Sequence, residues 1–210
     1  MKKYEKAILW IILVQCTFFF ALYRWHSTSQ VDVGKALVPI KISSQILIGD
    51  EKELVGNSHA LYTLVEFGDY ECPPCAHMNS QVKLLLAHYP DDLRFRFRHY
   101  PLKMHTYAMS CAIAAEKART LGSFSDVHDH LYALQTNVSP DQVTKLMLKL
   151  HLDITHLPIQ QQVAAQKHVQ EDIKIANSFG LERTPTFLLC CPDERVLKLN
   201  SLSQAEYFLK

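Results

Sequence analysis

Residues 62–75 read YTLVEFGDYECPPC, and this stretch decides the fold. The apolar run 62–67 predicts a strand, and the pattern of residues 76–88 that follows the cysteines predicts a helix. Two cysteines separated by two residues at a strand-to-helix turn are typical of a thiol–disulfide active site. Cys72 then lies at the amino end of the helix, whose partial positive charge favours the thiolate that attacks disulfides, and Cys75 lies within bonding reach one turn later.

Zinc sites use the same cysteine spacing, but they normally add a second ligand pair at a similarly short spacing. Cys190 and Cys191 are adjacent and do not repeat the pattern, and His77 has no partner histidine at ligand spacing. The sequence therefore favours redox chemistry over a metal site. We expect no metal and no separate cofactor, because the redox-active group is the Cys72–Cys75 pair itself.

Length and composition fit a globular domain. The chain has 210 residues, enough for one sizeable domain with an insertion, and its 48% hydrophobic and 20% charged residues are ordinary for a folded protein. The net charge of +1 gives no reason to expect nucleic acid or a strongly acidic partner.

The amino terminus is expected to lie outside the fold. Three lysines precede the uncharged stretch 7–23, and Arg24 closes it. Segment 1–24 therefore predicts cytoplasmic lysines followed by a single membrane anchor, with the rest of the chain on the exported side. A cleaved signal peptide is the alternative, with small residues at 27–29. We favour the anchor, because Arg24, Trp25 and His26 form a poor approach to a cleavage site.

Residues 25–60 are expected to form a tether. Residues 45–48 predict an additional short strand within it, and Gly49-Asp50 would end that strand in a turn.

A second strand is predicted over residues 93–100, where Leu and Phe alternate with Arg94, Arg96 and Arg98. The row of arginines is interpreted as a solvated face near a sheet edge. An anion-binding row is the less favoured alternative.

The remaining patterns are helical and then return to strand. Residues 104–180 have helical periodicity, with a helix start at Ser139-Pro140 and a carboxyl cap at Gly180. Strands are predicted at 186–190 and 196–199, and a final helix at 203–210. The order predicts an α/β layered domain built from residues 61–102 and 160–210, with a helical block, residues 103–159, inserted between them.

At this point the chain resembles the DsbA-like branch of the thioredoxin superfamily. The residues that carry the resemblance are 64–75, RHYPL at 98–102 with His105, and RTPTF at 183–187. The match covers about residues 45–210. It implies a thioredoxin-like fold with an inserted helical domain, and it implies that Pro185 is a cis proline that faces the cysteine pair.

The resemblance also implies roles for individual residues. Cys72 would attack and form the mixed disulfide, and the buried Cys75 would resolve it. Thr184 and Pro185 would border the substrate groove, with the backbone at Thr184 pairing with an extended substrate segment.

Three further residues would support the active site. Pro73 and Pro74 would fill the first two helical positions, where proline is tolerated. Glu66 matches the buried acid of the family, which could shuttle the proton of Cys75. The alternative for Glu66 is a partly exposed strand residue.

Other chemically active residues have no assigned role. Cys111 is expected to be a small buried hydrophobic residue. Cys190 and Cys191 could form a strained disulfide, remain free, or pair in part with Cys111. His128 and His130 flank Asp129 on a helix and diverge around its axis, so a metal site there is disfavoured.

These observations predict a membrane-tethered thiol–disulfide oxidoreductase that exchanges disulfides with exported proteins, in a direction that the residues do not fix. It would be a single-pass protein of the inner membrane with its catalytic domain facing the periplasm or the cell exterior. Its redox partner would be a quinone-linked membrane oxidase or a reductase. The first alternative is a non-enzymatic metal-handling or chaperone-like binding protein on the same fold. A detoxifying transferase of related fold is disfavoured, because it has no need of two cysteines.

Overall fold

The computed structural model describes residues 15, 17, 19, 20, 37 and 39–209. The predicted anchor, segment 1–24, lies almost entirely outside these residues. Within the described part of the chain, no helix is both long enough and apolar enough to cross a membrane. The chain divides into the units 1–36 and 37–210, and the fold belongs to the second.

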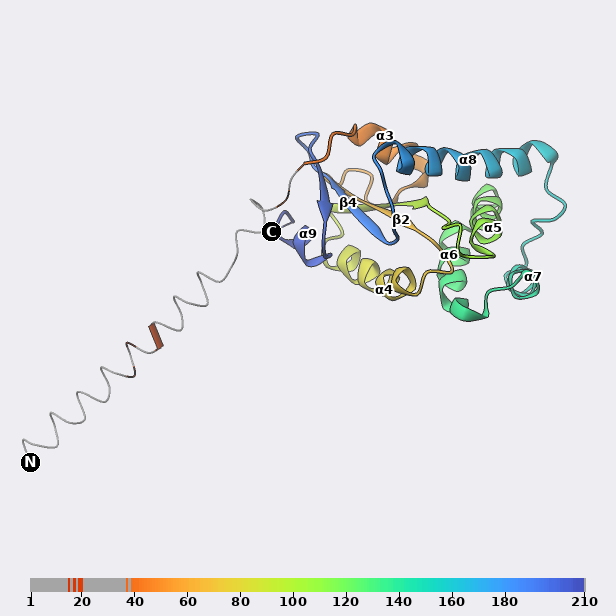
Figure 1. The fold of residues 1–210 in the computed structure, drawn as a ribbon, viewed down its shortest axis with the longest axis horizontal. Coiled ribbons are helices and arrows are strands. Elements are labelled where there is room, and N and C mark those ends of the chain that lie inside the picture. Colours follow the sequence, from red (N-terminus) through yellow and green to blue (C-terminus); the bar gives the residue numbers. More distant parts are fainter. Residues whose placement is uncertain (1–14, 16, 18, 21–36, 38, 210) are drawn as a thin grey trace, which may run out of the picture. The chain divides into compact units, whose positions relative to one another are not determined.

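A mixed sheet with the strand order β1-β3-β2-β4-β5 forms the centre of this unit (Figure 1). The strands are β1 (Val55–Gly56), β2 (Tyr62–Gly68), β3 (Leu93–His99), β4 (Thr186–Cys190) and β5 (Val196–Leu199). β2 and β3 run parallel, and the other neighbouring pairs are antiparallel. The four strands predicted around the cysteine motif and near the carboxyl end are confirmed. The very short β1 was not predicted, because two residues carry no periodic signal.

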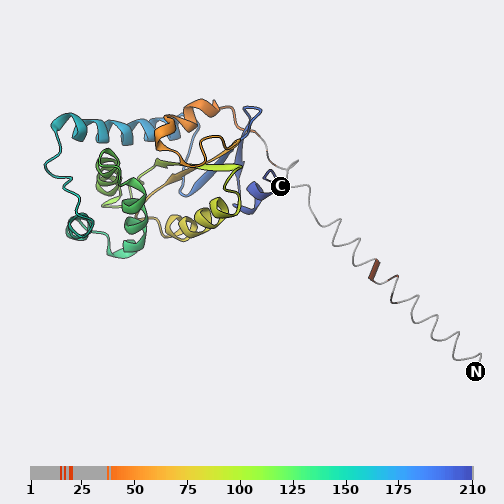
Figure 2. The same cartoon turned by 180° about the vertical axis from the view of Figure 1, so that it is seen from behind.

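Helices cover both faces of the sheet, which explains why β2 is buried along nearly its whole length (Figure 2). On one face, α4 (Pro73–His88) and α9 (Ser203–Glu206) pack over Leu64, Phe97 and Phe187. On the other face, α3 (Ser44–Ile48) and the end of α8 (Ile159–Ser178) pack over Phe67 and Leu188. α9 is shorter than the predicted helix 203–210.

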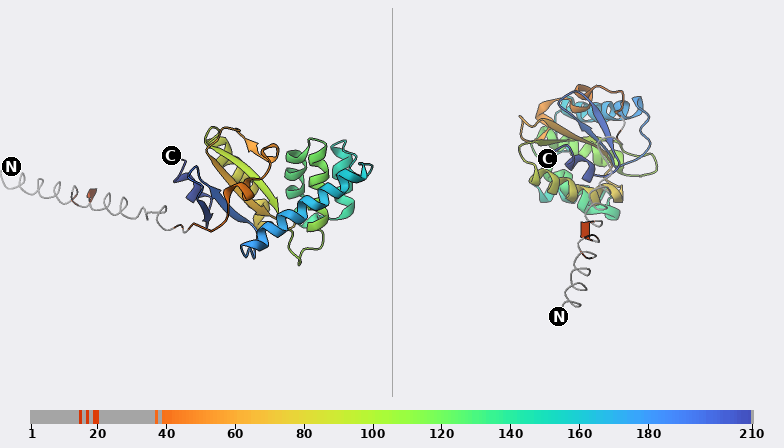
Figure 3. Two further views of the ribbon diagram at one scale, coloured as in Figure 1. Left: turned by 90° about the horizontal axis from the view of Figure 1, so that it is seen from above. Right: turned by 90° about the vertical axis from the view of Figure 1, so that its left-hand side faces the viewer.

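The inserted helices form a block at one end of the sheet (Figure 3). They are α5 (Ala108–Thr120), α6 (Phe124–Leu134), the short 3-10 helix η2 (Gln135–Asn137) and α7 (Pro140–Lys149), and α8 runs from this block back to the sheet. The predicted helix start is confirmed, since the Ser139 hydroxyl accepts a hydrogen bond from the Gln142 amide at 3.3 Å. α5 begins at Ala108 rather than near Met104, which is exposed.

The strand predicted at residues 45–48 is wrong, because this segment is the helix α3. Leu47 is fully buried beneath the sheet. The Arg98 guanidinium accounts for the helical form: it donates hydrogen bonds to the carbonyl oxygens of Leu47 at 2.7 Å and Ile46 at 2.6 Å. Carbonyls at the end of a helix lack partners within the helix, and a cation there is favourable.

The prediction that the arginines of β3 form a solvated face is also wrong. Arg96 and Arg98 are only 1% and 3% exposed. Arg98 forms an ion pair with Asp172 of α8, and Arg96 pairs with Glu53 of the 3-10 helix η1 (Glu51–Glu53). β3 is not an edge strand, since it lies between β1 and β2 with α8 against this face.

Candidate active site

The cysteine pair occupies the first turn of α4. Cys72 is the residue that caps the helix, and Pro73 and Pro74 occupy its first two positions, where both are exposed. Proline fits there because the first amides of a helix have no partner within it, and the fixed φ angle of proline suits the helix start. Cys72 is nearly buried and Cys75 is fully buried, and both are free thiols.

The loop between α8 and β4 brings a second segment to the cysteines. The Cys72 thiol donates a hydrogen bond to the Thr184 carbonyl oxygen at 3.4 Å. The Thr184–Pro185 peptide bond is cis, as the resemblance implied. A groove of about 360 Å³ lies beside this loop and is lined by Met78 of α4, residues 183–187 and residues 198–201.

The two thiols titrate in opposite directions. A hydrogen bond from the Cys75 thiol lowers the pKa of Cys72 to about 6, helped by donors to the thiolate from the Thr184 side chain and the Cys75 amide and opposed by burial. Burial, the hydrogen bond to Cys72 and the charge of Glu66 raise the pKa of Cys75 far above its ordinary value. At neutral pH, Cys72 is therefore the thiolate and Cys75 keeps its proton.

Glu66 lies in β2 behind this pair. It is 0% exposed, and neither carboxylate oxygen has a hydrogen-bond partner. Burial, and secondly the charge of Cys72, raise the pKa of Glu66 to about 8. The alternative of a partly exposed strand residue is wrong, and the charge of Glu66 acts on the pKa of Cys75.

Two acidic residues hold the turn before Cys72, and the sequence analysis did not single them out. Asp69 accepts hydrogen bonds from the amide of Leu102 at 2.7 Å, from Nδ1 of His105 at 2.8 Å and from the amide of Glu71 at 2.8 Å. Glu71 accepts a hydrogen bond from the Tyr107 amide at 2.5 Å. These bonds tie the active-site turn to the loop that follows β3. Their sequence signal was the two acids on either side of Tyr70, within three residues of the first cysteine.

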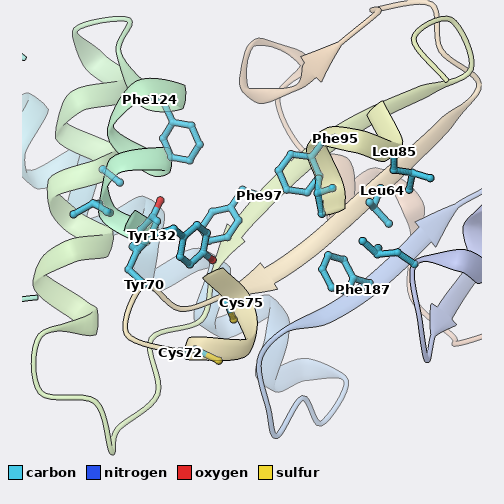
Figure 4. Close-up of a cluster of buried hydrophobic side chains, with 14 of the residues drawn as sticks. Leu64, Tyr70, Cys72, Cys75, Leu85, Phe95, Phe97, Phe124, Tyr132 and Phe187 are labelled. Atoms are coloured by element: carbon cyan, nitrogen blue, oxygen red, sulfur yellow. The ribbon is translucent and has the colours of Figure 1, made fainter. Parts of the chain in front are cut away.

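Buried aromatic side chains pack beside the first turn of α4, among them Tyr70 and Tyr132 (Figure 4). Their ring centroids lie 4.9 Å apart, and the Tyr70 hydroxyl forms a 3.1 Å hydrogen bond with Nδ1 of His128. Burial lowers the pKa of His128 to about 3, so that the ring is neutral at pH 7. Within the described residues, no group of three or more His, Cys, Asp or Glu side chains could hold a metal ion.

The other described cysteines are also free and buried. Cys190 packs in the core on the α8 side of the sheet and Cys191 in the core on the α4 side, so they do not form the vicinal disulfide. Cys111 lies within α5, and burial raises the pKa of its thiol to about 12. This burial confirms the expectation that Cys111 is a small core residue.

Comparisons with known proteins agree with this arrangement. A family model described as thioredoxin matches residues 50–209. Among solved structures, the thiol–disulfide exchange protein alpha-DsbA2 from Wolbachia pipientis is 15% identical with a TM-score of 0.68, and the match covers 79% of this chain and 89% of that one. A thioredoxin-like oxidoreductase from Silicibacter pomeroyi is 24% identical with a TM-score of 0.64, covering 79% and 95% of the two chains. At these identities the likeness shows the fold.

Curated relatives are longer proteins. The Na⁺/H⁺ antiporter NhaA 1 of Mycobacterium sp. (strain KMS) is 32% identical over 138 residues, which is 64% of this chain and 22% of the antiporter. The antiporter NhaA 1 of Mycolicibacterium vanbaalenii is 29% identical over 179 residues, which is 82% of this chain and 28% of the antiporter. The chain thus spans between about a fifth and somewhat more than a quarter of the length of these relatives.

Proposed function

The chain belongs to the thioredoxin family, and from this premise we propose that it is a thiol–disulfide oxidoreductase that exchanges disulfides with exported proteins through Cys72 and Cys75. The observation that carries the proposal is the placement of two thiols one helical turn apart at the amino end of α4, with the Cys72 thiol against the Thr184 carbonyl and the two pKa values shifted in opposite directions. A thiol of pKa about 6 is largely a thiolate at neutral pH, whereas its neighbour is held as a thiol. This is the asymmetry that separates an attacking cysteine from a resolving one.

The exchange follows from these protonation states. The Cys72 thiolate attacks one sulfur of a substrate disulfide, the substrate S–S bond breaks, and a mixed disulfide with Cys72 forms. Cys75 then loses its proton and attacks Cys72, which closes the Cys72–Cys75 disulfide and releases the second substrate thiolate. The cysteine pair gives up two electrons and the substrate gains them. The reverse sequence oxidises a substrate dithiol.

Glu66 is the proposed acceptor of the Cys75 proton. The charge of Cys72 is one of the two causes that raise the pKa of Glu66. That charge disappears when Cys72 enters the mixed disulfide, so the Glu66 carboxylate becomes easier to form at the step that needs a base. Thr184 and Pro185 line the groove next to the loop between α8 and β4, and the Thr184 carbonyl contacts Cys72. An extended substrate segment would pair with the backbone there.

We further propose that the stretch 7–23 tethers the domain to the inner membrane, with the domain on the periplasmic or outer side. The flanking lysines and Arg24 support this orientation. A membrane redox partner, either a quinone-linked oxidase or a reductase, would then reset the cysteine pair. Membrane fractionation of the full chain tests the tether, and mass spectrometry of the mature amino terminus separates an anchor from a cleaved peptide. A terminus near Gln30 would refute the anchor.

Cysteine variants test the activity. We expect Cys72→Ser to abolish insulin reduction and peptide oxidation, and Cys75→Ser to accumulate mixed disulfides with substrates, because the resolving thiol is missing. Cys111→Ser is the matched control, since it removes a buried thiol outside the first turn of α4. Full turnover by Cys72→Ser would favour the alternative, a non-enzymatic binding protein. The equilibrium of the pair with glutathione then gives the direction.

A further inference from the structure

Glu66 and Tyr132, two buried residues near the cysteine pair, have polar atoms without hydrogen-bond partners. Both carboxylate oxygens of Glu66 and the hydroxyl oxygen of Tyr132 are buried and have no hydrogen-bond partner. The two side chains come from distant elements, β2 and α6, and are 0% and 2% exposed. Buried polar atoms without a hydrogen-bond partner are uncommon in folded proteins and often indicate a functional role.

The strand geometry places these atoms near one another. Side chains two residues apart on a strand point to the same face, so Glu66 and Gly68 face the same side of β2. The Tyr132 hydroxyl oxygen lies 2.6 Å from the position that a Cβ on Gly68 would take. The hydroxyl and the edge of the Phe97 ring, which lies even nearer to the same position, therefore share the next place along this face. This place is about 7 Å of strand from Glu66, and a glutamate side chain extended along the strand covers much of that distance.

Of the two tyrosine hydroxyls near Glu66, that of Tyr132 has no hydrogen-bond partner. The titratable groups whose charges interact with Glu66 are Cys72 and Cys75 from α4, Tyr70 from the turn after β2 and Tyr132 from α6. Asp69 interacts with Tyr132 and Cys72, and Phe97 and Phe187 pair with Glu66 in β3 and β4. The Tyr70 hydroxyl is engaged by His128. Asp69 accepts three hydrogen bonds elsewhere.

We propose that Tyr132 is a positioning residue for the proton-transfer step: its hydroxyl donates a hydrogen bond to the ionised Glu66 carboxylate, directly or through one water molecule. The inference rests on the proposed function. In the resolving step the S–H bond of Cys75 breaks and its proton moves to the carboxylate, which becomes a carboxylic acid. The electron pair left on Cys75 forms the bond to Cys72, and the Cys72–substrate bond breaks with its pair on the departing thiolate.

Tyr132 keeps its own proton throughout this step. Burial and the nearby charge of Glu66 raise its pKa well above the ordinary value for tyrosine. A neutral hydroxyl that faces a carboxylate stabilises the charged form and lowers the pKa of the acid. The inserted helical block, to which α6 belongs, would therefore act on the chemistry of the cysteine pair.

Release of thionitrobenzoate from a disulfide reagent measures attack and resolution as two separate steps. When the reduced protein meets one equivalent of 5,5′-dithiobis(2-nitrobenzoate), the first release reports attack by Cys72 and the second reports resolution by Cys75. We expect Tyr132→Phe to leave the first release within twofold of wild type. The second release should slow about tenfold at pH 7, and its pH midpoint should rise by about one unit, the effect of losing one hydrogen bond to a charged group.

Matched variants assign the effect to Glu66. Tyr70→Phe removes a hydroxyl that bonds to His128, and the midpoint of its second release should not move. In a Glu66→Gln background, Tyr132→Phe should cause no additional slowing. An unchanged midpoint in Tyr132→Phe, or the same slowing in both backgrounds, would overturn the inference.

A variant that fails to fold and a wild type without activity each have a defined reading. If Tyr132→Phe does not fold, 3-fluorotyrosine at position 132 keeps the ring and strengthens the donor, so the midpoint should fall; a midpoint that stays or rises overturns the inference. If the wild type shows neither release, the proposed function fails instead.

Discussion

The Cys72 thiol lies 3.4 Å from the Thr184 carbonyl oxygen, although 112 residues separate the two in the sequence. The contact joins the amino end of α4 to the loop that carries the cis peptide bond before Pro185. The Thr184 hydroxyl is buried there and has no partner while Cys72 is a thiol. As a donor to the Cys72 thiolate, the Thr184 side chain helps to lower the pKa of Cys72. Thr184 therefore influences the pKa of the nucleophile Cys72 and also lines the groove.

Thr184→Val tests this link, because valine keeps the shape of threonine and removes the hydroxyl. We expect the pKa of Cys72 to rise by about one unit, since the thiolate loses a donor. Thiolate absorbance against pH measures it. Thr186→Val is the control, because the Thr186 hydroxyl bonds to the Arg183 carbonyl, at 2.8 Å. A lower or unchanged pKa in Thr184→Val would contradict the role given to the hydroxyl.

Glu66→Gln should change how stability depends on pH. The folded protein holds the Glu66 proton up to about pH 8, whereas an unfolded chain releases it near the ordinary value of 4.5. Between these values the unfolded state binds fewer protons, so the free energy of unfolding falls as pH rises. Glutamine cannot ionise and avoids this loss.

We expect the stability of Glu66→Gln relative to wild type to increase as the pH rises. Relative to wild type, reduced Glu66→Gln should gain up to about 5 kcal/mol in unfolding free energy as the pH rises from 4.5 to 8. Urea unfolding of both reduced proteins across this range measures the difference. A difference that stays constant with pH would show that Glu66 is ionised in the folded protein.

Removing one partner of the buried Arg98–Asp172 pair should be strongly destabilising. Asp172 is 0% exposed and also accepts a hydrogen bond from the His99 amide at 2.8 Å. Asp172→Ala leaves the buried Arg98 charge without its partner, so we expect a loss of about 3–5 kcal/mol in unfolding free energy. The control is Asp193→Ala, which removes the partner of Arg195 in an exposed pair and should cost far less, because solvent screens exposed charges. Equal losses in the two variants would refute the burial argument.

Local signals made much of this fold predictable. The strand–turn–helix around residues 62–75, the alternation in β3 and the serine cap before α7 each depend on residues within a few positions of one another. The same locality explains the errors. Alternation shows that Arg94, Arg96 and Arg98 share a face, but not that a helix covers it, and the ion-pair partner of Arg98 lies 74 residues away.

In the candidate site, too, features set by local sequence were predictable and features set by tertiary contacts were not. The cysteine motif was predictable from spacing, and the cis bond before Pro185 from resemblance. The segment 45–48 was misassigned because a short apolar run fits a strand or a helix equally well until its tertiary contacts are known. The neighbourhood of Glu66 and Tyr132 depends on how the inserted helices dock against β2, and no spacing rule in the sequence reports that.

The last prediction concerns Pro74, one of the two prolines between the cysteines, and its effect on the pKa of Cys72. Pro74 has no amide hydrogen, so of the backbone donors near the Cys72 sulfur the Cys75 amide remains, and this amide contributes to the low pKa of Cys72. Restoring the missing donor should stabilise the thiolate further. Pro74→Ala adds the amide alone, whereas Pro74→His adds the amide and a side chain that carries positive charge when protonated.

We therefore expect the pKa of Cys72 to fall in Pro74→Ala, by up to about one unit, and to fall further in Pro74→His. Each unit should make the pair more oxidising by about 30 mV, because a stabilised thiolate favours the reduced state. Position 74 is exposed, so neither change disturbs the core. Thiolate absorbance against pH gives the pKa values, and equilibration with glutathione gives the potentials. A Cys72 pKa that is unchanged or higher in both variants would show that backbone donors at the helix start do not control this thiolate.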